Sequence, residues 1–167
     1  LRTHFQGTEP DRLRDQLGGG ASHIAELIPE VLGILDGLES SPAMEPDQAR
    51  FRLFDSITGF FKRASDDSPV LLVIDDLHWA DQPSLLLLEF VARQLEGSRI
   101  MIVGTYRDSE APPESLLGQS LGRLARLASF QRQPITGLPP EDVASFVRGG
   151  DWHHTTGAAS KRYSCPY

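Results

Sequence analysis

Residues 70–81, VLLVIDDLHWAD, run from five apolar residues directly into two adjacent carboxylates, Asp75 and Asp76. A short, continuous apolar run that follows a turn (DDSP, residues 66–69) is typical of a strand buried on both faces of a parallel sheet. Side chains alternate along an extended chain, so the two acids are expected to point in different directions where the strand ends. The stretch therefore predicts a buried strand over residues 70–76 that delivers two carboxylates to one edge of a sheet.

Helical and extended patterns alternate on both sides of this strand. Before it, short helices are expected over residues 11–17 and 22–38, and an amphipathic helix over residues 48–64. After it, Asp81 is placed to cap the next helix. The remaining expected elements are a strand over residues 99–107, a helix over 114–128, a more polar strand over 130–136 and a last helix from about residue 140. This order predicts an α/β fold, with a parallel sheet of three strands flanked by helices, in one domain over residues 1–148.

The candidate site lies at two strand ends, because ligands of parallel sheets sit at the carboxyl ends of the strands. Asp75 and Asp76 follow the first strand, and Thr105 to Asp108 follow the second. Mg²⁺ prefers oxygen ligands and is commonly held by one or two carboxylates together with substrate phosphates. One acid could hold such an ion while the other orients an attacking water. The alternative is that both acids only cap the loop and the following helix.

Composition and charge argue against several classes of function. With 167 residues, 40% of them hydrophobic, the chain has the length and composition of one globular domain. Its net charge is −7 and no Lys/Arg-rich stripe reverses that sign locally, so direct binding to nucleic acid is not expected. A single cysteine, Cys165, excludes an internal disulfide and favours a reducing, cytoplasmic location. No apolar run approaches the ~20 residues that cross a bilayer, so no membrane partner is expected.

Two stretches carry a family resemblance: LLVIDDLHWADQPSLLLLEFVARQL (residues 71–95) and RIMIVGTYRD (residues 99–108). Together they resemble the Walker B and sensor 1 regions of the STAND group of signal-transducing P-loop ATPases, within the wider AAA-like assemblage. In particular, the chain is similar to the nucleotide-binding domains of large LuxR-type transcriptional regulators and of cyclase- or kinase-linked bacterial ATPases. The resemblance covers residues 2–147 and is strongest over residues 51–108.

The resemblance implies ATP and Mg²⁺ as ligands of the intact parent protein, and it implies a role for four residues. Asp75 would coordinate Mg²⁺ through water, Asp76 would be the catalytic or water-polarising acid, and Thr105 would line the same strand end. Arg107 would read the terminal phosphate, and its planar, always-charged guanidinium suits phosphate oxygens on physical grounds as well. The alternative for Arg107 is a salt bridge to Asp108 or to the acidic pair.

The neighbouring His78 and Trp79 are expected to be structural. An indole is mostly a large apolar body with one donor, so Trp79 is expected to pack over the end of the sheet. His78 is expected to bond within the loop.

A P-loop ATPase also needs the pattern G-x-x-x-x-G-K-[ST], whose backbone amides cradle the phosphates. Neither Lys62 nor Lys161 stands in that pattern. In the resembling family the P-loop and its strand precede this region, so the chain is expected to be a fragment without Walker A. A place in the sheet between the strands at 99–107 and 130–136 would then be vacant, and unpaired edges favour aggregation. We therefore expect weak or no ATP binding by this chain, and either poor solubility or non-native closure of the gap.

Residues 149–167 have no helical period and no apolar face. They are typical of an irregular tail, such as a frameshift produces. The adjacent His153 and His154, with the distant Cys165, lack the usual spacing of zinc ligands.

Three functions are open at this point. The leading one is a fragment of a regulatory ATP-binding and ATP-hydrolysing domain, whose parent switches between nucleotide states to control an attached output domain or its own self-association. The alternative is a catalytically inactive interaction module with a degenerate nucleotide site. A response-regulator receiver also has a VIDD-like strand, but it needs its acidic pair near the amino end and a lysine at a later strand end, and this sequence has neither.

Overall fold

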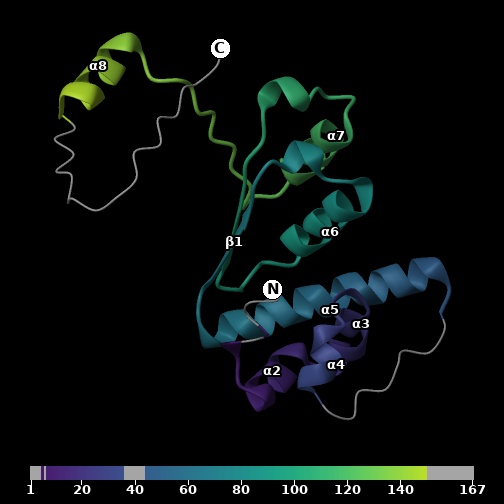
Figure 1. The fold of residues 1–167 in the computed structure, drawn as a ribbon. Coiled ribbons are helices and arrows are strands. Elements are labelled where there is room, and N and C mark those ends of the chain that lie inside the picture. The colour runs from purple at the N-terminus through teal and green to yellow at the C-terminus, as the bar shows by residue number, and fades with distance from the viewer. Residues whose placement is uncertain (1–4, 6, 36–43, 150–167) are drawn as a thin grey trace. The chain divides into compact units, whose positions relative to one another are not determined.

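The computed structural model describes residue 5, residues 7–35 and residues 44–149, with elements labelled as in Figure 1. The chain divides into two compact units, residues 1–131 and residues 132–167. The first unit combines a group of helices with a two-stranded parallel sheet and two more helices. The second contains one described helix, α8 (Pro140–Gly149), where the sequence predicts one. The α/β class is confirmed, and within the described ranges no helix is long and apolar enough to cross a membrane.

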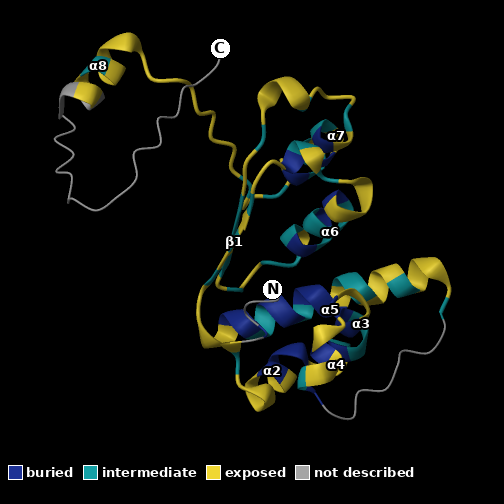
Figure 2. Ribbon diagram, viewed as in Figure 1, coloured by how far each residue is buried: buried dark blue, intermediate teal, exposed yellow. Residues whose placement is uncertain are grey.

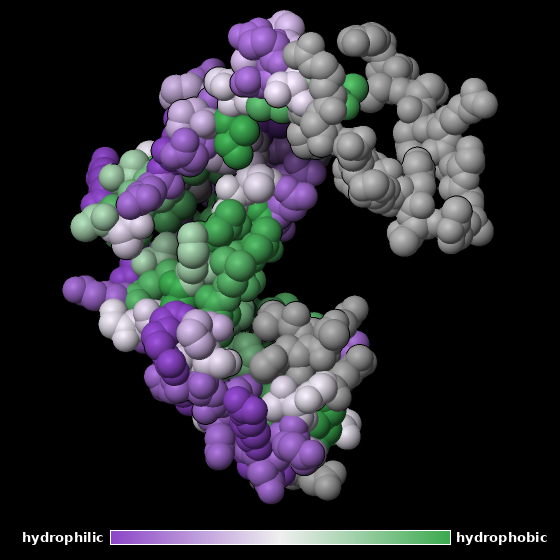
Figure 3. Space-filling view, turned by 90° about the vertical axis from the view of Figure 1, so that its left-hand side faces the viewer, coloured by the Kyte–Doolittle hydropathy of each residue, from purple (hydrophilic) through white to green (hydrophobic). Residues whose placement is uncertain are grey.

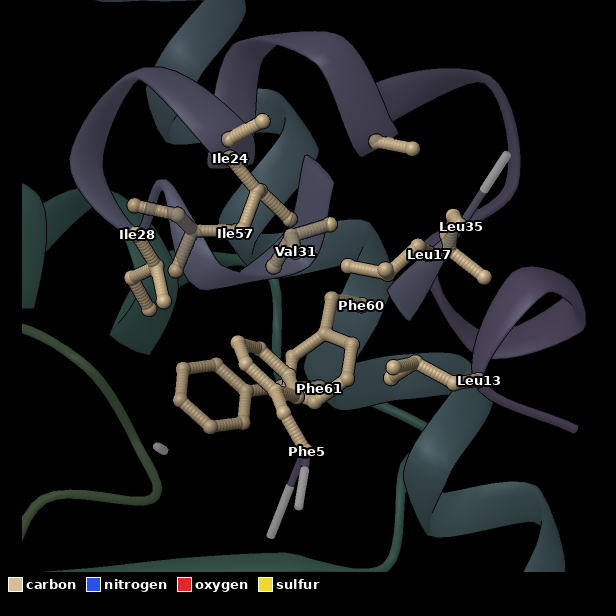
Figure 4. Close-up of a cluster of buried hydrophobic side chains, with 12 residues drawn as sticks. Phe5, Leu13, Leu17, Ile24, Ile28, Val31, Leu35, Ile57, Phe60 and Phe61 are labelled. Atoms are coloured by element: carbon tan, nitrogen blue, oxygen red, sulfur yellow. The ribbon is translucent and has the colours of Figure 1, made fainter. Parts of the chain in front are cut away.

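Three short helices pack against one long helix. These are α2 (Pro10–Leu17), α3 (Ala21–Leu27) and α4 (Glu30–Ile34), with the 3₁₀ turn η1 (Gly18–Gly20) between the first two, and the long helix is α5 (Pro46–Asp67). Figure 2 shows the buried residues of α5 on the side toward these helices, and Figure 4 shows the apolar side chains that meet there. Phe5 and Phe60 contact edge-to-face, with ring centroids 5.4 Å apart. The core comprises Phe5, Leu13, Leu17, Ala21, Ile24, Ala25, Ile28, Val31, Leu35, Ile57, Phe60 and Phe61.

The helix expected over residues 22–38 is broken into two. Ile28 leaves the helical conformation, with φ −130° and ψ 80°, and α4 begins after Pro29. Proline lacks an N–H group and disfavours helical geometry in the residue before it, so the chain turns here instead of continuing. Residues 36–38 of the expected helix lie outside the described residues.

Helix α5 extends beyond the predicted 48–64, and two aromatic residues of its amino-terminal half, Phe51 and Phe54, are not in the core. Phe51 is 58% exposed. It contacts Phe90 edge-on, with ring centroids 5.6 Å apart, and Phe54 lies 5.7 Å from the same ring. The amino-terminal half of α5 is thus joined to the next helix of the chain, α6 (Gln82–Arg93).

Strands β1 (Val70–Ile74) and β2 (Ile100–Gly104) pair in parallel, with Val70 opposite Ile100 and Ile74 opposite Gly104. Both strands fall within their predicted ranges. Helix α6 begins where expected, because the Asp81 carboxylate accepts a hydrogen bond from the Ser84 amide at 3.0 Å. Helix α7 (Leu116–Leu124) follows β2 and packs against α6.

The prediction that β1 is buried on both faces is wrong. Burial alternates along it: Val70 and Leu72 pack toward the helical core, whereas Leu71 and Val73 are 62% and 59% exposed. Met101 of β2 is exposed to a similar degree, 63%. In Figure 3, which views the left-hand side of Figure 1, hydrophobic surface gathers across the middle of that face. No described element of the first unit covers these three residues, so within that unit the sheet has one covered and one open face.

The third strand, expected over residues 130–136, is not formed. These residues lie in the described part of the chain, but the sheet there has only β1 and β2. A strand needs a neighbour for its backbone hydrogen bonds, and no described strand lies beside this segment. Ile135 is accordingly 92% exposed. The expected irregular tail, residues 149–167, lies outside the described residues apart from Gly149, which ends α8.

Helices α6 and α7 are joined by a buried carboxylate. Glu89 accepts hydrogen bonds from the Ser120 hydroxyl at 2.7 Å and from Nε and Nη2 of Arg123 at 2.7 and 2.8 Å. The residue is only 5% exposed. Burial alone would raise the pKa of Glu89, but the hydrogen bonds from Arg123 and Ser120 outweigh it and hold the pKa below its usual value. Every oxygen of this carboxylate is therefore satisfied within the protein.

Candidate functional site

The carboxyl ends of β1 and β2 are fastened together just beyond the strand pairing. The Thr105 amide donates to the Ile74 carbonyl at 3.0 Å, and the Leu77 amide donates to the Thr105 carbonyl at 2.8 Å. The parallel ladder thus continues for one residue past β2 and places Thr105 beside Asp75 and Asp76. The juxtaposition expected from the parallel strands is present.

The Thr105 hydroxyl links the two acids. It donates a short hydrogen bond to Oδ1 of Asp75, and it accepts one from the Asp76 amide at 3.1 Å. A hydroxyl can donate once and accept twice, so one side chain can serve both neighbours. Thr105 therefore fixes the orientation of one carboxylate and the backbone of the next residue.

Asp76 has a left-handed backbone, with φ 54° and ψ 48°. It is the one non-glycine residue with positive φ in the described part of the chain. Asp and Asn tolerate this conformation better than most residues. The turn leads directly into the 3₁₀ helix η2 (Leu77–Trp79), whose Trp79 amide donates to the Asp76 carbonyl at 2.9 Å. The chain therefore reverses sharply at Asp76, which leaves the side chains of both acids exposed.

Gly104 and Leu77 lie close together under this turn. A Cβ atom on Gly104 would be 2.3 Å from Cδ1 of Leu77, which is only 7% exposed. The absence of a side chain at the end of β2 lets Leu77 pack down and anchor the loop that carries the acids.

Arg107 is not brought to the acidic pair. Its side chain is 72% exposed, and Nη1 lies 3.5 Å from Oε1 of Glu110, one turn further along in the 3₁₀ helix η3 (Asp108–Glu110). The salt bridge expected as its alternative role thus exists, but with Glu110 instead of Asp108 or the acidic pair. An exposed ion pair of this kind contributes little to stability, so the guanidinium can move to another anion at small cost.

His78 and Glu110 are the site residues that sequence reasoning missed. The His78 side chain is only 1% exposed, and its Nε2 lies 3.6 Å from Oε2 of Glu110 and 3.8 Å from Oδ1 of Asp76. Both distances exceed those of a hydrogen bond, so these are electrostatic contacts. Nδ1 of His78 is buried with no hydrogen-bond partner among the described residues. Within its loop the His78 side chain makes only the 3.8 Å contact with Asp76, which is not the bond that was expected, and its contact with η3 was not predicted.

Trp79 does not pack over the sheet end as expected. It is 78% exposed, and its ring contacts that of His78 at a centroid distance of 5.4 Å. The side chains of Leu77 and His78 are buried, whereas Trp79, the last residue of η2, points to solvent.

The donors at the strand ends suit a hard cation. Carboxylate and hydroxyl oxygens are the ligands that Mg²⁺ prefers, and Mg²⁺ usually takes only one or two carboxylates from the protein. In the described ranges, no group of three or more His, Cys, Asp and Glu side chains is arranged to hold a metal ion by itself. Asp75, held by Thr105, therefore fits a site in which a ligand supplies the remaining oxygens.

Comparison with known proteins gives one match. A family model described as "AAA ATPase domain" matches residues 4–103, which is more than half of the chain. No curated protein and no solved structure matches. The matched region includes β1, both acids, His78 and most of β2, and it ends just before Thr105.

Proposed function

Because the chain belongs to the AAA ATPase domain family, we propose that its two strand ends form the metal-binding and water-orienting part of an ATP-hydrolysing site. ATP and Mg²⁺ are the ligands that this family generally uses. The observation that carries the proposal is the Thr105 hydroxyl, which joins both acids at adjacent strand ends. Two adjacent carboxylates at the ligand edge of a parallel sheet, one of them oriented by a hydroxyl, are suited to phosphoryl transfer, where catalysis is mostly positioning and charge stabilisation.

In this proposal each residue has its own task. Asp75, fixed by Thr105, holds Mg²⁺ directly or through its water, and the ion supplies neutralisation of charge on the phosphates. Asp76 accepts a hydrogen bond from the attacking water and orients it. Arg107 exchanges its exposed contact with Glu110 for the terminal phosphate, two of whose oxygens can accept hydrogen bonds from the planar guanidinium fork.

Asp75 and Asp76 are thereby assigned to Walker B, and Thr105 and Arg107 to sensor 1, of a STAND-like regulatory ATPase. Its nucleotide state would control an attached output domain or self-association. The strand-end loops support a switch, because the contact that holds Arg107 is weak and exposed.

The test compares ATP binding and ATP hydrolysis in the natural protein that contains this sequence, with and without Asp76→Asn. We expect the variant to retain ATP affinity and to lose turnover by about 100-fold or more, the usual range for a general base. Asp75→Asn is expected to weaken Mg-ATP binding as well. Unchanged turnover in Asp76→Asn would remove this residue from the mechanism.

The second candidate is an interaction module without turnover, and the open face of the sheet favours it. Leu71, Val73 and Met101 are each about three-fifths exposed, and together they form an apolar surface of the kind that marks interaction sites. This candidate predicts that Asp75→Asn and Asp76→Asn leave all function of the natural protein intact, whereas Val73→Lys removes it. The ATPase proposal predicts loss of turnover from either Asp variant.

A further inference from the structure

Side chains from two different loops form a chain of contacts that runs from Arg107 through Glu110 and His78 to Asp76. Glu110 of η3 lies between Arg107 and His78: one oxygen faces Nη1 of Arg107 at 3.5 Å and the other faces Nε2 of His78 at 3.6 Å. His78 in turn faces Oδ1 of Asp76 at 3.8 Å. The loop after β1 and the loop after β2 are thus connected through side chains as well as through Thr105.

We propose that His78 and Glu110 are positioning residues: Glu110 orients His78, and His78 holds the Asp76 carboxylate in place for its water. The inference rests on the proposed function, in which Asp76 orients the attacking water. Glu110 also holds Arg107, so one carboxylate positions both the phosphate-reading cation and, through His78, the water-orienting acid.

The burial of His78 defines its tautomer. Nδ1 is buried without a hydrogen-bond partner in the described structure, whereas Nε2 faces two carboxylates. A buried N–H group without an acceptor costs more than a bare ring nitrogen, and N–H groups point toward carboxylates. The N–H group of the imidazole is therefore placed on Nε2, which faces the carboxylates of Glu110 and Asp76.

A structural histidine would be expected to satisfy both nitrogens or to be replaceable by any apolar residue of its size. His78 satisfies neither nitrogen with a true hydrogen bond, yet it directs one of them into the acidic edge of the site. A Leu at this position would fill the same buried space and would remove only the interaction with the two carboxylates.

The test is an NMR experiment on this chain. It follows the carboxyl carbon resonance (¹³Cγ) of Asp76 and the side-chain ¹⁵N resonances of His78. We expect Glu110→Gln to shift the His78 ¹⁵N resonances and the Asp76 ¹³Cγ resonance. The matched control is Glu114→Gln, an exposed acid four residues later whose side chain has no contact with His78, and it is expected to shift neither. His78→Leu is expected to shift Asp76 ¹³Cγ, and His78→Gln, which restores an N–H donor of similar reach, is expected to reverse most of that shift.

The inference would be overturned if the ¹³Cγ chemical shift of Asp76 were unchanged in both Glu110→Gln and His78→Leu. It would also be overturned if His78→Leu and His78→Gln changed that chemical shift equally. Thermal unfolding of each variant shows whether it is still folded. If His78→Leu is unfolded, Glu110→Gln, a change on the surface, still tests the inference. A parallel addition of Mn²⁺ alone to this chain separates the two proposals. If Mn²⁺ leaves the strand-end amides unaffected while the ¹³Cγ shifts occur as expected, the metal site fails and the positioning contacts stand.

Discussion

The first unit of this chain contains a buried carboxylate and a group of strand-end carboxylates, which differ in how fully protein hydrogen bonds satisfy their oxygens. Glu89, between α6 and α7, is buried and accepts three hydrogen bonds within 2.8 Å. Asp75, Asp76 and Glu110, at the strand ends, are more exposed, and the contacts of Asp76 and Glu110 with charged side chains are 3.5 Å or longer. The first group is saturated by the protein itself, whereas the second keeps oxygens available for a ligand. Charge alone does not distinguish a structural acid from a functional one, but the degree to which its oxygens are satisfied does.

The largest expected effect on the free energy of unfolding comes from disrupting the hydrogen bonds of Glu89. Glu89→Gln removes the negative charge and one of the two acceptor oxygens and turns an NH2 group toward Arg123 or Ser120, and we expect a loss of about 2 kcal/mol in the free energy of unfolding. This is below the roughly 3–5 kcal/mol for a fully buried pair, because Arg123 reaches solvent. Urea unfolding monitored by circular dichroism measures the loss. The exposed Glu96→Gln is the matched control and should change stability by less than about 0.5 kcal/mol. Equal stability of the two variants would mean that the Glu89 network contributes nothing net.

A change of pH should weaken the same group without mutation. The pKa of Glu89 is lower in the folded chain than the ~4.3 of an unfolded Glu, so its stabilising contribution is fully present above that value. It is lost as the pH falls through the folded pKa. Asp67 and Asp81 also have lowered pKa values and act in the same direction, so only the difference between variants isolates Glu89. We expect the stability gap between the native chain and Glu89→Gln to shrink on acidification, and a constant gap would contradict this.

Removing the hydroxyl that joins the two acids should have a smaller effect. Thr105→Val keeps the shape of the side chain but removes its bonds to Asp75 and to the Asp76 amide. Net contributions of hydrogen bonds are near 1 kcal/mol, and we expect a loss of about that size or less because the site is exposed. Thr105→Ser should retain most of the stability. If Thr105→Val costs as much as Glu89→Gln, the strand-end group is structural in the same sense as the Glu89 group.

The smallest effect on stability is expected for Asp76→Asn. Asn tolerates the left-handed backbone at least as well as Asp, and the change removes repulsion from Asp75 and Glu110. We expect a change within about 0.5 kcal/mol, in contrast to Glu89→Gln. Asp76→Ala should cost more, because alanine disfavours φ 54°. A large loss in Asp76→Asn would show that its carboxylate supports the fold instead of a ligand.

The sequence predicted the parts of the fold that depend on local pattern. Residue spacing and residue type predict the apolar runs of β1 and β2, the cap at Asp81 and the apolar face of α5. The expected parallel pairing of the two strands then placed Thr105 beside the acids. The third strand failed because strand formation depends on a partner, which a single segment does not specify. The prediction that both faces of β1 are buried failed for the same reason, because burial of a face depends on a second element that covers it.

Other features of the site depend on the three-dimensional path of the loops. Glu110 approaches His78 only because η3 folds back over η2, and no periodic pattern connects positions 32 residues apart. The sequence analysis expected an ion pair of Arg107 with Asp108 or with the acidic pair, and it predicted neither the contact of Glu110 with Arg107 nor its contact with His78. The left-handed backbone at Asp76 likewise follows from the turn after β1, not from the residue type alone.

The most direct test of the account adds Mn²⁺, as a paramagnetic substitute for Mg²⁺, to this chain without nucleotide, because ATP binding by this chain is expected to be weak or absent, and follows the backbone amide resonances. We predict selective broadening at residues 75–77 and 105–107, abolished in Asp75→Asn and retained in Glu114→Gln. Broadening spread evenly over all exposed acids, or broadening that persists unchanged in Asp75→Asn, would contradict the assignment of the strand ends as the metal-binding part of the site.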